Sequence, residues 1–120
     1  MMILNYLQER KNMAIAHAVA GKAMNLFLSE SELGRAKTTA LIKTSNFEVI
    51  RLCVDSKQEI APHKTKGPIT VQCLQGKVNF TVGETENEMT PGDWLYLEGG
   101  QVHSLLGIED SVLLLTIVFS

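Results

Sequence analysis

Short apolar segments rich in Val, Ile, Leu, Thr and Phe recur along the chain from residue 38 onward, and turn residues separate them. The segments cover 38–43, 47–54, 69–74, 77–82, 86–89, 94–97, 102–106 and 112–119. Within 47–54 the side chains alternate, so that Phe47 and Val49 fall on one face and Ile50 and Leu52 on the other. Both faces are largely apolar, which indicates a strand covered on both sides. Many short strands separated by turns are typical of an all-β sandwich or barrel.

Residues 1–35 have a different pattern. Six apolar positions recur at helical spacing, namely Met13, Ala16, Ala20, Ala23, Met24 and Phe27. Gly21 weakens such a helix by about 1 kcal/mol relative to alanine, and Ser29 to Gly34 form a polar break. We therefore predict a helical or irregular N-terminal arm over 1–35, followed by one β-barrel domain over 36–120. Two placements of the arm stay open: over an edge of its own barrel, or exchanged with a second subunit.

Composition excludes several classes of function. The 120 residues are 45% hydrophobic, which is enough for the core of a single domain. Eleven basic and thirteen acidic residues give a net charge of −2 without a basic cluster, so we expect no nucleic-acid partner. The longest apolar run, 112–119, is far shorter than the ~20 residues of a membrane-spanning helix, so we expect no membrane partner.

The cysteines and the N-terminus bear on localisation. Cys53 and Cys73 both lie in apolar strand-like segments, which favours buried free thiols in a reducing compartment over a disulfide between neighbouring strands. Residues 10–20 resemble a short signal peptide, but His17 interrupts the apolar stretch and Glu9 adjoins the basic pair. We therefore expect mature sequence and a cytoplasmic protein.

Two of the three histidines bracket the middle of the predicted sheet. His63 follows Pro62, and His103 lies forty residues later, beyond the turn at Pro91-Gly92. Because the two histidines fall on different strands, a rolled-up sheet can bring them together. The sequence therefore predicts that His63 and His103 are neighbours inside the barrel.

The segment from 61 to 115 resembles the two motifs of the cupin superfamily. The first motif is the stretch 62–76 and the second is the stretch 91–103. The residues in register with the family pattern are His63, Gly76, Gly92, Gly100 and His103. The resemblance implies a double-stranded β-helix, or jelly-roll, barrel. The fifteen residues between Gly76 and Gly92 are similar to those of compact microbial members.

The sequence departs from the family pattern at the metal ligands. The resemblance implies a site of three histidines and one carboxylate, but Thr65 occupies the second histidine position and Ile69 the glutamate position. Glu98 and Gly107 replace a proline and an asparagine of the second motif. Only His63 and His103 remain as ligands, and two imidazoles alone rarely hold a divalent ion. The cofactor is therefore either none or a divalent metal ion held by His63, His103 and a further group.

A third ligand from Cys73, Gln72 or water stays open. Cys73 shares a strand face with Ile69, so it can point into the barrel beside the histidines. Glu98 is a further candidate for a replacement acid. Trp94 and Tyr96 share one strand face, which favours packing in the core or in a dimer over ligand binding.

Three functions are compatible with this pattern. The first is a cupin barrel that binds a small molecule in a mostly apolar pocket, with five candidate ligand-binding residues: His63, Thr65, Ile69, Cys73 and His103. The second is a metal-dependent dioxygenase or isomerase with a non-standard ligand set. The third is a non-enzymatic structural or regulatory barrel. In each case we expect a homodimer, because the strand edges and the apolar outer face of 112–119 require cover.

Overall fold

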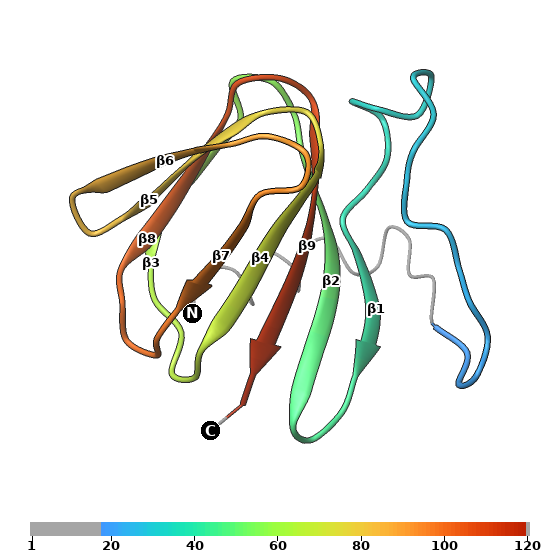
Figure 1. The fold of residues 1–120 in the computed structure, drawn as a ribbon, viewed down its shortest axis with the longest axis horizontal. Coiled ribbons are helices and arrows are strands. Elements are labelled where there is room, and N and C mark those ends of the chain that lie inside the picture. Colours follow the sequence, from blue (N-terminus) through green and yellow to red (C-terminus); the bar gives the residue numbers. More distant parts are fainter. Residues whose placement is uncertain (1–17, 120) are drawn as a thin grey trace.

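The computed structural model describes residues 18–119, and within this range the chain forms nine β-strands and no helix. The strands are β1 (Thr39–Lys43), β2 (Phe47–Val54), β3 (Glu59–His63), β4 (Ile69–Gln75), β5 (Val78–Val82), β6 (Thr85–Met89), β7 (Trp94–Leu97), β8 (His103–Gly107) and β9 (Ser111–Val118) (Figure 1). They form a five-stranded sheet, β1-β2-β9-β4-β7, and a four-stranded sheet, β3-β8-β5-β6. All pairings are antiparallel, and the chain crosses repeatedly between the sheets. The predicted all-β jelly-roll fold is confirmed.

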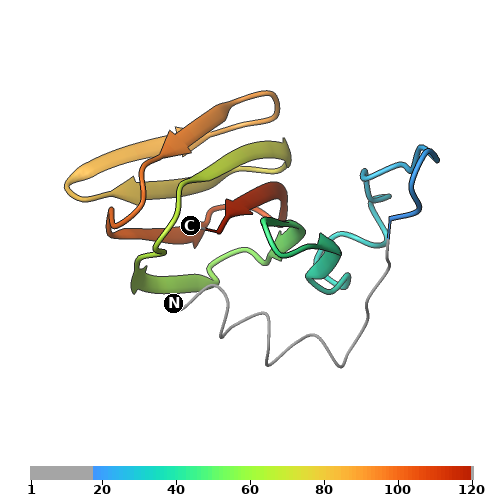
Figure 2. The same cartoon turned by 90° about the horizontal axis from the view of Figure 1, so that it is seen from below.

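The two sheets enclose one apolar core, around which the strands wind (Figure 2). Ile50, Val71 and Leu115 from the five-stranded sheet are inaccessible to solvent. Phe80 and Leu105 from the four-stranded sheet are 1% and 3% exposed. Burial of each such side chain contributes about 1.5–3 kcal/mol to folding. The core therefore holds the sheets face to face and fixes which side chains point into the barrel.

Strand β2 shows the alternation expected from the sequence. Ile50, Leu52 and Val54 on the inward face are at most 1% exposed, whereas Phe47 and Val49 on the outward face are half-buried. At the end of the strand the outward Cys53 is also buried, and its backbone N–H donates to the Thr38 hydroxyl at 3.0 Å. Both faces are thus at least partly covered, as predicted.

The pattern of apolar residues in the sequence did not predict strand β3. Its sequence, Glu59-Ile-Ala-Pro-His63, contains one large aliphatic residue and a proline, so it does not alternate clearly. Pro62 is tolerated because β3 is an edge strand, where a missing backbone donor breaks no ladder on the open side. The pairing of β3 with β8 shifts register between Ile60 and His63.

The described part of the N-terminal arm, 18–35, is irregular. The helical spacing therefore does not produce a helix over 18–28, and the expectation for 1–17 falls outside the described residues. Gly21 adopts a φ of 78°, which no right-handed helix contains. The arm is instead tied to the barrel by hydrogen bonds: the Ala18 N–H donates to the Leu41 carbonyl at 2.7 Å. The Gln75 side-chain amide also accepts from the Leu28 N–H at 2.8 Å and donates to the Leu28 carbonyl at 2.7 Å.

None of the described residues forms a helix long and apolar enough to cross a membrane. Cys53 and Cys73 are both buried, and no disulfide joins them.

Candidate functional site

The two imidazoles predicted to meet inside the barrel do so. His63, the last residue of β3, pairs in register with His103, the first residue of β8. The ring centroids lie 4.3 Å apart, and the ring planes are inclined at 65°. His63 is 6% exposed and His103 is 2% exposed. The pairing of β3 with β8 therefore brings together two histidines that are forty residues apart in the sequence.

Backbone carbonyls and an aromatic ring hold the imidazoles in place. The Nδ1 of His63 lies 2.7 Å from the Ala61 carbonyl oxygen, and the Nδ1 of His103 lies 3.0 Å from the Gln101 carbonyl oxygen. The Phe80 ring from β5 stacks on His103, with centroids 5.7 Å apart and planes 12° from parallel. Each carbonyl belongs to the residue two positions before its histidine, so the local backbone sets the ring orientation.

These contacts fix the protonation pattern of the neutral rings. A carbonyl oxygen only accepts, so Nδ1 carries the hydrogen in both rings and Nε2 carries a lone pair. Both Nε2 atoms are buried, and neither has a hydrogen-bond partner among the described residues. Burial away from water lowers the pKa of both histidines, although the Nδ1 hydrogen bonds act in the opposite direction. In His63 the charge of a protonated His103 lowers the pKa further. The site therefore presents two neutral acceptors.

Thr65 lies in the loop directly after β3 and is 3% exposed. Its hydroxyl donates to the Gly67 carbonyl at 2.8 Å, so its hydrogen is already used within the loop. Its backbone carbonyl accepts from the Gly100 N–H at 2.8 Å. Thr65 thus joins the loop that follows His63 to the loop that precedes His103.

Ile69 forms part of the apolar core of the barrel. It is 1% exposed, and it lies in one row across the five-stranded sheet with Leu97, Ile117 and Glu48.

Glu48 is 5% exposed and shares the inward face of β2 with Ile50. Sequence reasoning did not single out Glu48. It could have been identified in the sequence as the one glutamate on a strand face that is otherwise apolar.

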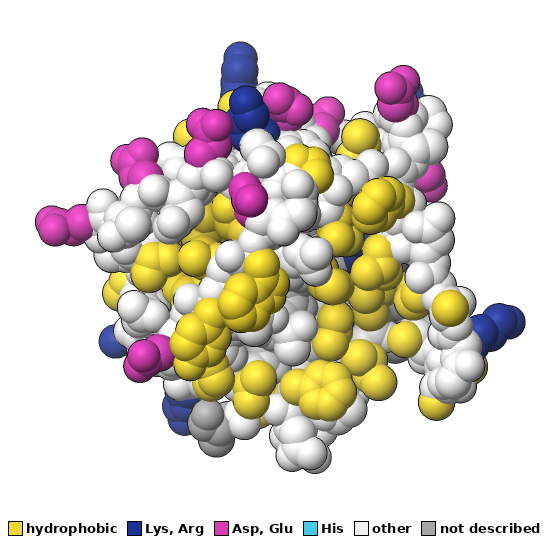
Figure 3. All heavy atoms as spheres, in the orientation of Figure 1, with side chains coloured by type: hydrophobic (Ala, Val, Ile, Leu, Met, Phe, Trp, Pro, Cys, Tyr) yellow, Lys and Arg dark blue, Asp and Glu magenta, His cyan; other side chains and the backbone are white. Residues whose placement is uncertain are grey.

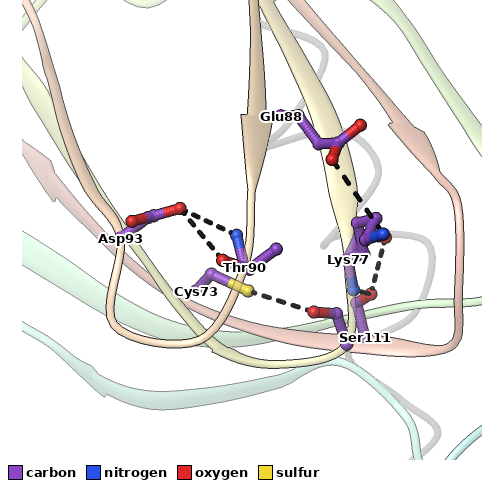
Figure 4. A network of polar contacts seen from close by, with 7 residues as sticks. Cys73, Lys77, Glu88, Thr90, Asp93 and Ser111 are labelled. Atoms are coloured by element: carbon purple, nitrogen blue, oxygen red, sulfur yellow. Dashed lines mark hydrogen bonds and ion pairs between the residues drawn. The ribbon is translucent and has the colours of Figure 1, made fainter.

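Cys73 points into the barrel, as its position on the strand predicted, but it does not lie beside the two histidines. It is fully buried, four residues beyond Ile69 on β4, which corresponds to about 13 Å along the strand. Its Sγ lies 3.6 Å from the Gln75 carbonyl oxygen, at the end of the barrel where Ser111 and Asp93 also lie (Figure 4). Burial, and then the charge of Asp93, raises the pKa of the thiol to about 11. The thiol is therefore protonated and distant from the imidazoles.

The candidates that the sequence left open for a third metal ligand do not complete a metal site in the described residues. No group of three His, Cys, Asp or Glu within 18–119 is arranged to hold a metal ion, so Cys73, which the sequence left open as a third ligand, does not form such a group with His63 and His103. Gln72 lies on the opposite face of β4 from Ile69 and Cys73, and Glu98 is exposed on the loop before β8. Two imidazoles fall short of the three protein ligands of a catalytic site. The described residues therefore do not fit the metal centre that the cupin resemblance implies.

Comparison with family models and with curated proteins finds no match to this sequence. Solved structures do match. A conserved protein of unknown function from Streptococcus pyogenes is 19% identical, with a TM-score of 0.73 over 90% of this chain and 96% of that one. A cupin superfamily protein from Desulfitobacterium hafniense is 14% identical, with a TM-score of 0.69 over 82% and 100% of the two chains. An RmlC-like cupin from Desulfovibrio desulfuricans is 21% identical, with a TM-score of 0.66 over 81% and 95%. At these identities the likeness shows the fold, and the chain has the RmlC-like cupin fold that its two motifs indicated.

Proposed function

We propose that this cupin barrel binds a small molecule between and above His63 and His103. The observation that carries the proposal is the pair of buried Nε2 atoms without a hydrogen-bond partner in the described chain. A buried acceptor left unsatisfied costs about 1–3 kcal/mol. A ligand that donates to either Nε2 removes this cost, so a hydrogen-bond donor on the ligand supports binding.

The surroundings favour recognition by a few polar groups in an apolar site. Phe80 stacks on His103 and fixes the plane of its ring, and the barrel interior is otherwise largely apolar. The backbone carbonyls of Ala61 and Gln101 hold the imidazoles without help from a ligand, so the acceptors are oriented in advance. Sites of this kind, apolar with a small number of placed polar groups, are typical of small-molecule pockets. A neutral imidazole can also accept a proton from a bound substrate.

The test is a small-molecule screen monitored on the two rings. In protein labelled with ¹⁵N-histidine, a ligand that donates to Nε2 shifts the Nε2 resonances of His63 and His103 while both Nδ1–H signals persist. His103→Phe removes one acceptor and keeps a flat ring for Phe80 to stack on, so we expect affinity to fall about tenfold. Ser104→Ala, at the next position along β8 and on its other face, is the matched control and should bind as the wild type does.

Two results would contradict the proposal. Stoichiometric binding of Zn²⁺, Mn²⁺ or Fe²⁺ to the rings would favour the metal-dependent enzyme instead. Ring resonances that no member of a diverse screen shifts, together with native mass spectra free of any retained small molecule, would favour the non-enzymatic barrel.

We also propose that a second copy of the chain covers the outer face of the five-stranded sheet. Figure 3 shows hydrophobic side chains gathered over this face. Trp94 and Tyr96 on β7 are 62% and 53% exposed, and Val118 on β9 is 39% exposed. Large aromatic side chains dominate interface energetics. Analytical ultracentrifugation should show a dimer that Trp94→Lys dissociates, whereas Leu106→Lys on the outer face of the four-stranded sheet should leave the dimer intact. A wild-type monomer at micromolar concentration would contradict this.

A further inference from the structure

A hollow opens at the end of the barrel where the histidines lie. Its volume is about 410 Å³, and its walls come from Lys64, Thr65, Lys66, Gly99 and Gly100. We call it the rim hollow. Lys64 directly follows His63, and Gly100 precedes His103 by three residues, so both walls continue into the strands that carry the imidazoles.

The two loops around the rim hollow are fixed to each other. The Gly100 N–H donates to the Thr65 carbonyl at 2.8 Å. A Cβ on Gly99 would collide with the Lys66 carbonyl oxygen, so only glycine permits this close approach. The Gln101 side chain accepts from the Glu98 N–H at 2.8 Å, and the Gln101 carbonyl holds His103. The rim is thus joined to the imidazole pair by direct contacts.

The charge at the rim hollow is positive. Lys64 and Lys66 are both exposed, and neither forms an ion pair with a residue in the described range. The acidic neighbour on the rim, Glu98, is exposed and is not among the lining residues. The whole chain carries a net charge of −2, so this cationic surface is a local feature. Unpaired ammonium groups beside a concavity attract an anion and donate charge-assisted hydrogen bonds to it.

We propose that the rim hollow receives the carboxylate or phosphate of a small ligand, whose other end carries the hydroxyl or amine that donates to His63 and His103. The inference rests on the proposed small-molecule function and names its ligand class. Along the strands the rim lies one to three residues from the imidazoles, which corresponds to roughly 3–10 Å. A ligand with about two to six heavy atoms between its anionic and donor groups spans this interval.

The experiment uses the full-length protein and four small probes. Glycerol 3-phosphate and 3-hydroxybutyrate carry an anion and a hydroxyl, and glycerol and 1,3-butanediol are their neutral counterparts. We expect the two anionic probes to shift the ring resonances of His63 and His103, with dissociation constants at least tenfold below those of the neutral probes. The difference should shrink as ionic strength rises, because the rim lysines are exposed to solvent. Comparing the dissociation constants of the two anionic probes shows whether the rim hollow prefers a phosphate or a carboxylate.

Matched lysine variants locate the anion. Lys64→Gln/Lys66→Gln should weaken the anionic probes at least tenfold and leave the neutral ones unchanged. Lys22→Gln/Lys57→Gln removes the same charge from the arm and from the turn before β3, and should change neither.

Four outcomes would overturn the inference. Neutral probes that shift the rings as strongly as anionic ones would leave the small-molecule function standing without the anionic class. The same holds for anionic binding that is insensitive to the Lys64/Lys66 substitutions. Anionic binding that depends on these lysines but leaves the ring resonances unchanged would reduce the rim hollow to an anion site separate from the histidines. Failure of all four probes in the presence of another ligand found by the ring-monitored screen would exclude this class while retaining the function.

Discussion

Lowering the pH from 7.5 to 5.5 should destabilise the fold through His63 and His103. Both are held neutral in the folded barrel, where burial lowers their pKa below the usual value near 6.5. In the unfolded chain the two imidazoles bind protons as the pH falls through 6.5. Since the unfolded state then binds more protons than the folded state, the free energy of unfolding decreases with falling pH. Their stabilising contribution is complete above pH 6.5 and is lost below it.

The size of the effect follows from proton linkage. A histidine that stays neutral in the folded state loses about 1.4 kcal/mol of stability per pH unit below its unfolded pKa. The two histidines together therefore lose at most about 3 kcal/mol between pH 7.5 and 5.5. The rings lie 4.3 Å apart, so a proton on one ring lowers the pKa of the other, in the same direction as burial does. Such a loss is a large fraction of the 5–15 kcal/mol that stabilises most domains.

Urea unfolding at several pH values measures this directly. The comparison is with His63→Gln/His103→Gln, which retains two polar side chains but removes both titrations. Glu48 and the rim lysines are present in both proteins, so their contributions to the pH dependence largely cancel. We expect the wild-type free energy of unfolding to fall more than that of the variant over this range, by up to about 3 kcal/mol. Equal slopes for the two proteins would refute the assignment of buried, neutral imidazoles.

Three further predictions concern parts of the fold away from the histidines. Gly76→Ala should lower the free energy of unfolding by about 3 kcal/mol or more, because φ is 82° and a Cβ would collide with the Asp110 carbonyl oxygen; an unchanged urea midpoint would contradict this. Gln75→Ala removes both hydrogen bonds to Leu28, so limited proteolysis should cleave the arm near residue 28 several-fold faster than in the wild type. Unchanged cleavage would show that other contacts hold the arm. Cys73 is fully buried with a pKa of about 11, so a thiol reagent at pH 8 should modify it only after unfolding, and rapid modification of the native protein would contradict its placement.

The meeting of His63 and His103 could be predicted because it depends on strand order and motif spacing. Periodicity missed β3, so the prediction came from the two motifs, each of which carries one of the histidines; in the structure these lie at the end of β3 and the start of β8. The hydrogen-bond state of the rings could not be predicted in this way. It depends on the carbonyls of Ala61 and Gln101, whose directions follow from the bulge in β3 and the turn before β8.

Cys73 shows the limit of strand periodicity. Alternation correctly assigns its inward face, but it says nothing about depth along the barrel, which the register of β4 against β9 determines. The N-terminal arm shows a different limit. Apolar residues do recur at helical spacing before Leu28. In the structure, however, hydrogen bonds to Leu41 and Gln75 tie the described part of the arm to the barrel in an irregular conformation. Tertiary hydrogen bonds outweigh the weak propensity of a short, glycine-containing segment.

The most direct test is a long-range ¹H–¹⁵N spectrum of the histidine rings at pH 7.5, combined with ring-to-ring nuclear Overhauser effects. The account predicts that His63 and His103 are both neutral, with hydrogen on Nδ1 and none on Nε2, and that protons of one ring show effects to the other. Hydrogen on Nε2 in either ring, or the absence of any effect between the rings, would contradict the claim that the barrel holds two adjacent acceptors ready for a ligand.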